Sequence, residues 1–198
     1  MALDLRKGNE LLYDAPRDPV FVEVPPLRYL LVNGSGAPIE ADYQHAIQAL
    51  YSMAYRLKYC LQENKNIDFS IMPLETLWWS EEGAAWSTDL SGWRWTALMR
   101  IPDAVCEDCY NACWEKAAER SDSPAFSRLR MRDWEEGRAV QVLHVGPWSE
   151  EEATVEKLHA FIAEYGGTTR GKHHEVYLSD PKRTKPAHLR TIIRQPIV

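Results

Sequence analysis

Hydrophobic and polar positions in the first half of the chain predict a strand, a long helix and two more strands. The strand covers "RYLLVNG" (28–34), and the helix follows over 42–61. Its apolar residues recur at spacings of three and four, as expected for a helix with one buried face; they are Ala46, Ile47, Leu50, Met53, Ala54, Leu57 and Leu61. Two stretches rich in β-branched and aromatic residues, 68–80 and 93–102, predict the strands after it.

The second half repeats this order. A strand is predicted over "AVQVLHVG" (139–146), a helix over 153–167 and two strands over 173–179 and 189–196. The two halves therefore predict one β-α-β-β unit used twice.

Short matches in the same order support the duplication. They pair "LVNG" with "LHVG", "PLETLWWS" with "HHEVYLSD", which places Glu75 over Glu175, and "ALMRIP" with "TIIRQP". We therefore expect an α+β fold of duplicated β-α-β-β units with pseudo-twofold symmetry around a central ligand cleft. Residues 1–198 form a single domain, with a first unit at about 27–102 and a second at about 139–198. A linker at about 103–138 holds a helix over 107–120 and a hairpin that turns at Glu136-Gly137.

The strand in "GKHHEVYLSD" carries a carboxylate beside an aromatic ring. Successive side chains on a strand point to opposite faces, so Glu175 and Tyr177 share one face while Val176 and Leu178 share the other. We expect the aliphatic pair to face the helix of the unit. Glu175 and Tyr177 then face away from it, together with Glu75, and line a cleft shared by the two units.

Composition and charge restrict the partners. The 198 residues are 45% hydrophobic with a formal net charge of −6, which is ordinary for a folded soluble protein and argues against nucleic-acid binding. No apolar run approaches the ~20 residues of a membrane helix, and the N-terminus carries charges where a signal peptide is apolar. We therefore predict a cytoplasmic protein with a small-molecule partner, no membrane or nucleic-acid partner, and no cofactor; the sequence does not indicate the oligomeric state.

Three of the four cysteines, Cys106, Cys109 and Cys113, form "CEDCYNAC", and Cys60 lies far away in the sequence. Their spacings place the three on one stripe of a helix, where small apolar residues usually face a core. No fourth ligand follows at a metal-like spacing, so we predict core packing and no metal site. Cys106 and Cys113 would lie about 10 Å apart along a helix, too far for a disulfide.

Aromatic residues are abundant, with eight Trp, nine Tyr and four Phe. Five tryptophans are candidates for an aromatic cage around a flat or cationic ligand: Trp79, Trp86, Trp93, Trp95 and Trp148. Core packing is the alternative for each of them. Tyr51, Tyr55 and Tyr59 recur every four residues on the first helix. Of the three, Tyr55 is the candidate ligand-binding residue.

Several motifs together resemble the GyrI-like small-molecule-binding family in its standalone form. They include "MPLETLWW" (72–79), "HVGPW" (144–148), "GKHHEVYLSDPKR" (171–183) and "TIIRQP" (191–196). The resemblance implies two β-α-β-β units around a cleft that binds amphipathic, often cationic, aromatic compounds, and it gives Glu175 the role of the ligand-facing glutamate. One branch of such proteins hydrolyses the cyclopropane ring of DNA-alkylating compounds with the help of an aromatic cage.

Two functions therefore remain open for the predicted cleft. The first is multidrug binding for xenobiotic protection, with Glu175, Tyr177 and Glu75 beside the cage tryptophans. The alternative is a cyclopropanoid hydrolase in which Glu175 is the general base and Tyr177 orients the water. A protein-interaction module is the weaker third hypothesis, because such a module favours an exposed apolar patch over a glutamate in a cage.

Overall fold

The computed structural model describes residues 3–80, 92–119, 121 and 123–198. The strands are β1 (Val20–Val24), β2 (Leu27–Ser35), β3 (Leu74–Ser80), β4 (Trp93–Arg100), β5 (Arg130–Trp134), β6 (Gly137–Val145), β7 (His173–Tyr177) and β8 (Arg190–Pro196). The α-helices are α1 (Ala41–Lys65), α2 (Glu107–Ala118) and α3 (Glu152–Glu164). Short 3₁₀ turns are η1 (Glu10–Leu12), η3 (Pro124–Arg128), η4 (Trp148–Glu150) and η5 (Pro186–His188).

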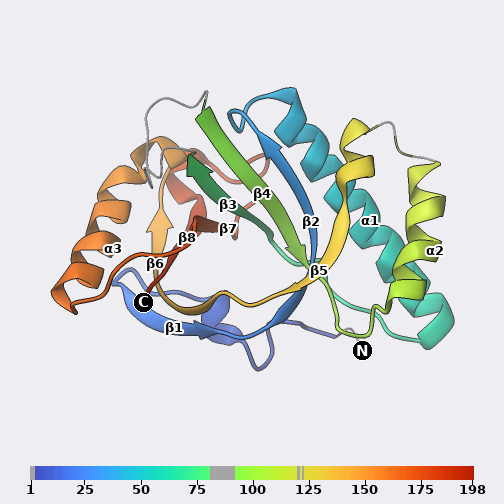
Figure 1. The fold of residues 1–198 in the computed structure, drawn as a ribbon, viewed down its shortest axis with the longest axis horizontal. Coiled ribbons are helices and arrows are strands. Elements are labelled where there is room, and N and C mark those ends of the chain that lie inside the picture. The colour runs from blue at the N-terminus through green and yellow to red at the C-terminus, as the bar shows by residue number, and fades with distance from the viewer. Residues whose placement is uncertain (1–2, 81–91, 120, 122) are drawn as a thin grey trace.

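All described strands belong to one curved antiparallel sheet in the order β1-β6-β8-β7-β3-β4-β2-β5 (Figure 1). The order has two equivalent halves, because β3-β4-β2 of the first unit matches β7-β8-β6 of the second. This arrangement confirms the duplicated β-α-β-β fold, and its pseudo-twofold axis passes between β3 and β7.

The hairpin expected around Glu136-Gly137 is wrong. Strand β5 pairs with β2 of the first unit, whereas β6 pairs with β1 and β8. Each unit thus receives its outer strand from the segment that precedes the other unit. Gly137 has the positive φ of a turn residue (+70°), but Glu136 is buried and bonded to His174 and Arg194, which directs the chain across the sheet.

Both long helices lie on the same face of the sheet. Helix α1 packs on β2 and β4, α3 packs on β6 and β8, and α2 packs against α1 (Figure 1). The predicted apolar stripe of α1 is buried apart from the half-buried Ile47, and α3 buries Val155, Leu158 and Ile162 against Val140, Val142 and Ile193. Among the helices of the described residues, none combines the length and apolar character that a membrane crossing requires.

The pairing of β3 with β7 places Glu75 and Glu175 on opposite faces. Thr76 lies opposite Glu175, and Glu75 lies opposite Val176. Directly opposed residues of an antiparallel pair share a face, and neighbours along a strand do not. The expected superposition of Glu75 on Glu175 is therefore wrong, because a twofold axis through the sheet can relate only residues of the same face.

The expected orientation of β7 relative to the helices is also wrong, whereas Glu75 on β3 faces away from them as expected. The hydroxyls of Tyr43 on α1 and Thr76 lie 2.7 Å apart, so α1 lies on the face that carries Thr76 and Glu175. Val176 belongs to the other face, and it packs in the core that includes Leu5 and Leu12 of the N-terminal segment. That segment covers the aliphatic side of the strand, which the sequence pattern had assigned to the helix.

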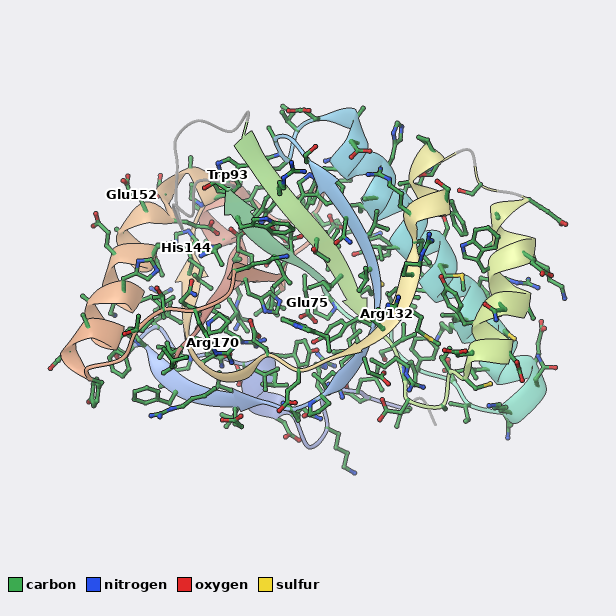
Figure 2. The ribbon with its side chains drawn as sticks, in the orientation of Figure 1. Glu75, Trp93, Arg132, His144, Glu152 and Arg170 are labelled. Atoms are coloured by element: carbon green, nitrogen blue, oxygen red, sulfur yellow. The ribbon has the colours of Figure 1, made fainter. Side chains whose placement is uncertain are left out.

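A buried polar network joins the N-terminal segment to the underside of the central strands, near the middle of the molecule, where Figure 2 labels Glu75. His174 Nε2 donates to Glu75 at 3.1 Å, and its Nδ1 donates to Glu136 at 3.0 Å. Tyr13 donates to Glu75 at 3.2 Å, and Arg194 bonds Glu136 at 3.3 Å. The formal charges of these two carboxylates, one imidazolium and one guanidinium cancel, so the network can be buried without net charge.

Arginine side chains extend the network to the backbone of the same segment. Arg194 donates to the carbonyl of Leu12 at 2.7 Å, and Arg100 donates to that of Leu5 at 2.7 Å. The N-terminal residues are therefore bound through their main chain as well as through their buried side chains.

His174 should make the protein less stable at alkaline pH. Its burial disfavours the charged form, but Glu136 and Glu75 outweigh burial and raise the pKa of His174 from 6.5 to about 9. The folded state thus holds a proton that the unfolded state loses above about 6.5, so stability is complete below that pH and falls as pH rises toward 9. We expect a loss on the order of 3 kcal/mol in the free energy of unfolding, measured by urea titration at both ends of this range.

The control is His188→Gln, which removes an exposed histidine and should retain the alkaline loss. His174→Gln should be less stable at neutral pH and should lose much less between the two pH values. The same alkaline loss in both variants would exclude His174 as its source.

Candidate functional site

The centre of the helix-bearing face lies between α1 and α3, over strands β3 and β7. These two strands are adjacent in the sheet, and the helices pack on the strands that flank them. We call the side chains gathered here the Glu175 site; they are Tyr43, Trp78, Trp148, Glu151, His173, Glu175, Tyr177 and Thr191.

Glu175 is nearly enclosed, with 6% of its surface exposed. His173, two residues earlier on the same face, has Nε2 3.1 Å from Glu175 Oε1. The Tyr177 hydroxyl also bonds Glu175, and burial followed by the negative charge of Glu175 raises the pKa of Tyr177 well above its ordinary value. Tyr177 therefore stays a neutral donor, and the carboxylate is held from both sides along one strand.

Aromatic side chains surround this carboxylate. The Trp78 indole donates to the Tyr177 hydroxyl at 3.1 Å, and its ring lies 5.2 Å from that of Tyr43. Trp93 and Trp95 continue the cluster, at 5.5 Å from Trp78 and 5.1 Å from Tyr43 respectively. Several π-faces thus lie beside a buried acid, an arrangement that suits flat or cationic molecules.

Trp148 forms the more accessible side of the site. Its ring meets that of Tyr177 at 5.7 Å and an interplanar angle of 73°, while 44% of the residue remains exposed. Its indole donates to Thr191 Oγ1 at 3.2 Å. Trp148 therefore lies at the boundary between the interior of the site and the solvent.

A second carboxylate, Glu151, faces Glu175. It is 2% exposed, and burial, together with the negative charge of Glu175, raises its pKa from 4.5 to about 10. Thr191 donates a hydrogen bond to it, but within the described part of the chain Glu151 Oε1 has no partner. Glu151 therefore keeps its proton at neutral pH.

The "HVGPW" segment positions Trp148 and Glu151. His144 on β6 lies between the strands and α3 (Figure 2), where its Nε2 donates to the carbonyl of Pro147 at 3.2 Å and its Nδ1 accepts from Thr154 at 2.9 Å. Gly146 has a φ of +151°, and a Cβ there would approach His144 Nε2 to 3.2 Å. The histidine and glycine therefore fix the loop that begins α3.

The structure brings most predicted site residues together. Glu175, Tyr177 and Trp148 are in direct contact, and Trp93 and Trp95 reach them through Trp78 and Tyr43. Trp93 lies at the end of β4 where Figure 2 labels it.

Other predicted residues lie elsewhere. Glu75 and Trp79 are on the opposite face of the sheet, and the Lys172 ammonium sits 3.2 Å from the centre of the Trp79 ring. Tyr55 is 47% exposed on α1. Trp86 lies outside the described residues.

Sequence reasoning missed Glu151, Tyr43 and Trp78. Glu151 stands in "SEEEA", which reads as the solvated start of a helix. Trp78 faces α1 together with Thr76, and it was missed because the cleft was expected on the side of the sheet away from the helices. The position of Glu151 shortly after the "GPW" turn is a signal that it could lie in the site. The sequence does not distinguish it from the two adjacent glutamates, however, because all three follow the same turn.

Comparisons with known proteins agree with this architecture. The sequence model of the GyrI-like small molecule binding domain matches residues 103–198. An uncharacterized conserved protein from Listeria innocua has a crystal structure with a TM-score of 0.92 and 36% identity, covering 99% of this chain and 100% of that one. A hydrolase from Listeria innocua gives a TM-score of 0.87 and 34% identity over 99% and 100% of the two chains. The comparison with curated proteins gives no match.

Identity of this level over the full length of both chains, together with the family match in the second half, identifies the fold and its family. The chain belongs to the GyrI-like small-molecule-binding family.

Proposed function

We propose that this protein is a hydrolase that binds flat aromatic substrates at the Glu175 site and opens an electrophilic ring in them. The observation that carries the proposal is the buried pair Glu175 and Glu151, in which burial and the charge of Glu175 raise the pKa of Glu151 to about 10, so Glu151 keeps its proton at neutral pH. A proton-bearing acid beside a second carboxyl group can supply a general acid next to a general base.

The substrate class is an activated cyclopropane conjugated to a dienone. Glu175 accepts a proton from water as the water oxygen bonds to a ring carbon. The cyclopropane C–C bond breaks, and its electron pair moves into the dienone, whose oxygen becomes a phenolate. Glu151 donates its proton to that oxygen, and the product differs from the substrate by one added water.

The surrounding groups support this chemistry. His173 and Tyr177 hold Glu175 in place, which limits the reorganisation needed at the moment of reaction. Trp148, which is 44% exposed, offers a ring face against which a flat substrate can lie, so the reacting carbon would be oriented relative to the carboxyl groups. Similarity to the Listeria innocua hydrolase over the whole chain supports the same class of reaction.

Glu175→Gln should abolish turnover and preserve the fold. The amide cannot accept the proton of water, so we expect a rate loss of about 10²–10⁴-fold. The measurement is mass spectrometry of a cyclopropane-bearing alkylator incubated with the protein, which should gain one water over many turnovers. Circular dichroism melting should change little, and substrate binding should persist. If the wild type binds the compound and returns it unchanged, the hydrolase proposal fails for this substrate class.

Glu151 should set the alkaline limit of the reaction. The acid form is present below its pKa of about 10, so the rate should fall as pH rises through that value. Glu151→Gln should slow the reaction at neutral pH and remove this decline. Glu152→Gln is the matched control, because it replaces the same carboxyl group by an amide on the exposed side of α3 (Figure 2) and should leave the profile intact. An unchanged profile in Glu151→Gln would assign the proton donor elsewhere.

The second candidate function is binding without chemistry, for amphipathic aromatic cations. The specific observation in its favour is that burial and the negative charge of Glu175 both raise the pKa of Glu151, so a bound cation would relieve the repulsion between the two acids. Cation binding would then let Glu151 release its proton. Binding and hydrolysis use the same side chains, and a substrate that carries no reactive ring would only bind.

Ligand charge should decide affinity at this site. An aminoacridine cation should bind at least about tenfold more tightly than an acridine carboxylate of the same ring size, since the negative charge of the buried acid pair attracts the cation and repels the anion. Calorimetry with the wild type and with Glu175→Gln measures the difference, and the variant should lose most of it. Equal affinities of the wild type for the two compounds would contradict the electrostatic part of the proposal.

A further inference from the structure

Three cysteines that are distant in the sequence meet between α1 and α2. Cys60 comes from α1, and Cys109 and Cys113 come from successive turns of α2. Their sulfur atoms all lie within 4.8 Å of one another, and the Sγ atoms of Cys60 and Cys109 are 3.7 Å apart. All three are free thiols. Neither helix contributes to the Glu175–Glu151 pair, so this cluster is separate from the proposed catalytic site.

The spacing matches a shared metal ion. Sulfur ligands lie about 2.3 Å from zinc, which places two sulfurs of a tetrahedral site about 3.8 Å apart. A disulfide would instead need a separation of about 2.05 Å and would use only two of the three thiols. A stripe that only packs in the core does not require a third thiol from another helix at the same point.

We propose that Cys60, Cys109 and Cys113 form a thiolate site for a soft, thiophilic metal ion such as Zn²⁺. Thiolate ligands select such ions over harder cations. Within the described residues no fourth histidine, cysteine or carboxylate joins the group, so the ion would keep one position for water or a small ligand. Cys113 is buried, whereas Cys60 and Cys109 are half-buried, which leaves a path from solvent to the ion.

The surroundings of Cys60 favour its thiolate. Burial opposes the charge, but hydrogen bonds from Cys113, Cys109 and Asn64, with the positive charge of Arg56, lower the pKa of Cys60 overall. Asn64 Nδ2 donates to its sulfur at 3.4 Å.

The other two thiols keep their protons in the empty site. Burial and the hydrogen bond with Cys60 raise the pKa of Cys109 to about 11 and that of Cys113 to about 12, and the charge of Cys106 adds to the effect at Cys109. An incoming ion must displace these protons, so affinity should rise with pH. The bound ion would join α1 of the first unit to α2 of the linker.

The test uses the full chain, reduced and freed of metal, and titrates it with Cd²⁺ and Co²⁺ as probes. We expect one ion per chain, a thiolate charge-transfer band in the ultraviolet, and the visible bands of tetrahedral Co²⁺. Zn²⁺ at 100 times its dissociation constant should raise Tm by about 5 °C or more, because only the folded state assembles the site.

Matched variants test whether the ion binds to the three clustered cysteines and not to the fourth cysteine. Cys60→Ser and Cys109→Ser should lose the band and the rise in Tm, and circular dichroism confirms that each remains folded. Cys106→Ser changes an exposed cysteine of the same motif and should bind like the wild type. The proposal is overturned if the wild type gives no charge-transfer band, if two chains share one ion, or if Cys106→Ser loses binding as fully as Cys60→Ser.

Discussion

The antiparallel pairing of β3 with β7 is the constraint on which the rest of the molecule depends. It places Thr76 opposite Glu175 and Glu75 opposite Val176, so each central strand presents one acid to a different side of the sheet. A shift of this register by one residue would exchange the two faces of the shifted strand. The acid of the helix side would then enter the polar network of the other side. The positions of both glutamates therefore follow from one set of backbone hydrogen bonds.

Glu75, on the face of the sheet away from the helices, makes a change of this strand register energetically costly. Glu75 is bonded by Tyr13, Tyr29 and His174, and each partner comes from a different segment of the chain. Breaking a buried ionic contact by removing one partner typically costs about 3–5 kcal/mol, because the remaining charge stays buried. Misregistered pairing would leave several such charges without partners. The network thus discriminates against alternative pairings, even though buried ion pairs add little net stability themselves.

The sequence predicted the elements better than their faces. The spacing of apolar residues located α1 and α3, because a helix with one buried side has a periodicity that no other element shares. The strands of both units and their duplication were also confirmed. The orientation of β7 was wrong and that of β3 was right, since alternation defines two faces without indicating which one a helix covers. The N-terminal segment covers the face that the helices leave open, and its charged sequence does not indicate that it would cover a sheet.

The sequence also predicted only some of the residues that form the site. Glu175 and Tyr177 could be paired from their spacing, because residues two apart on a strand must share a face. Glu151 could not, because its environment is created by Glu175 from a strand that follows it in the chain. Repulsion between these two acids is a cost that the folded protein carries at neutral pH, and it is limited by keeping one proton in the site. A binding protein would release that proton to accommodate a cation, whereas a hydrolase would deliver it to the substrate. The two proposed functions therefore differ in the destination of the proton on Glu151.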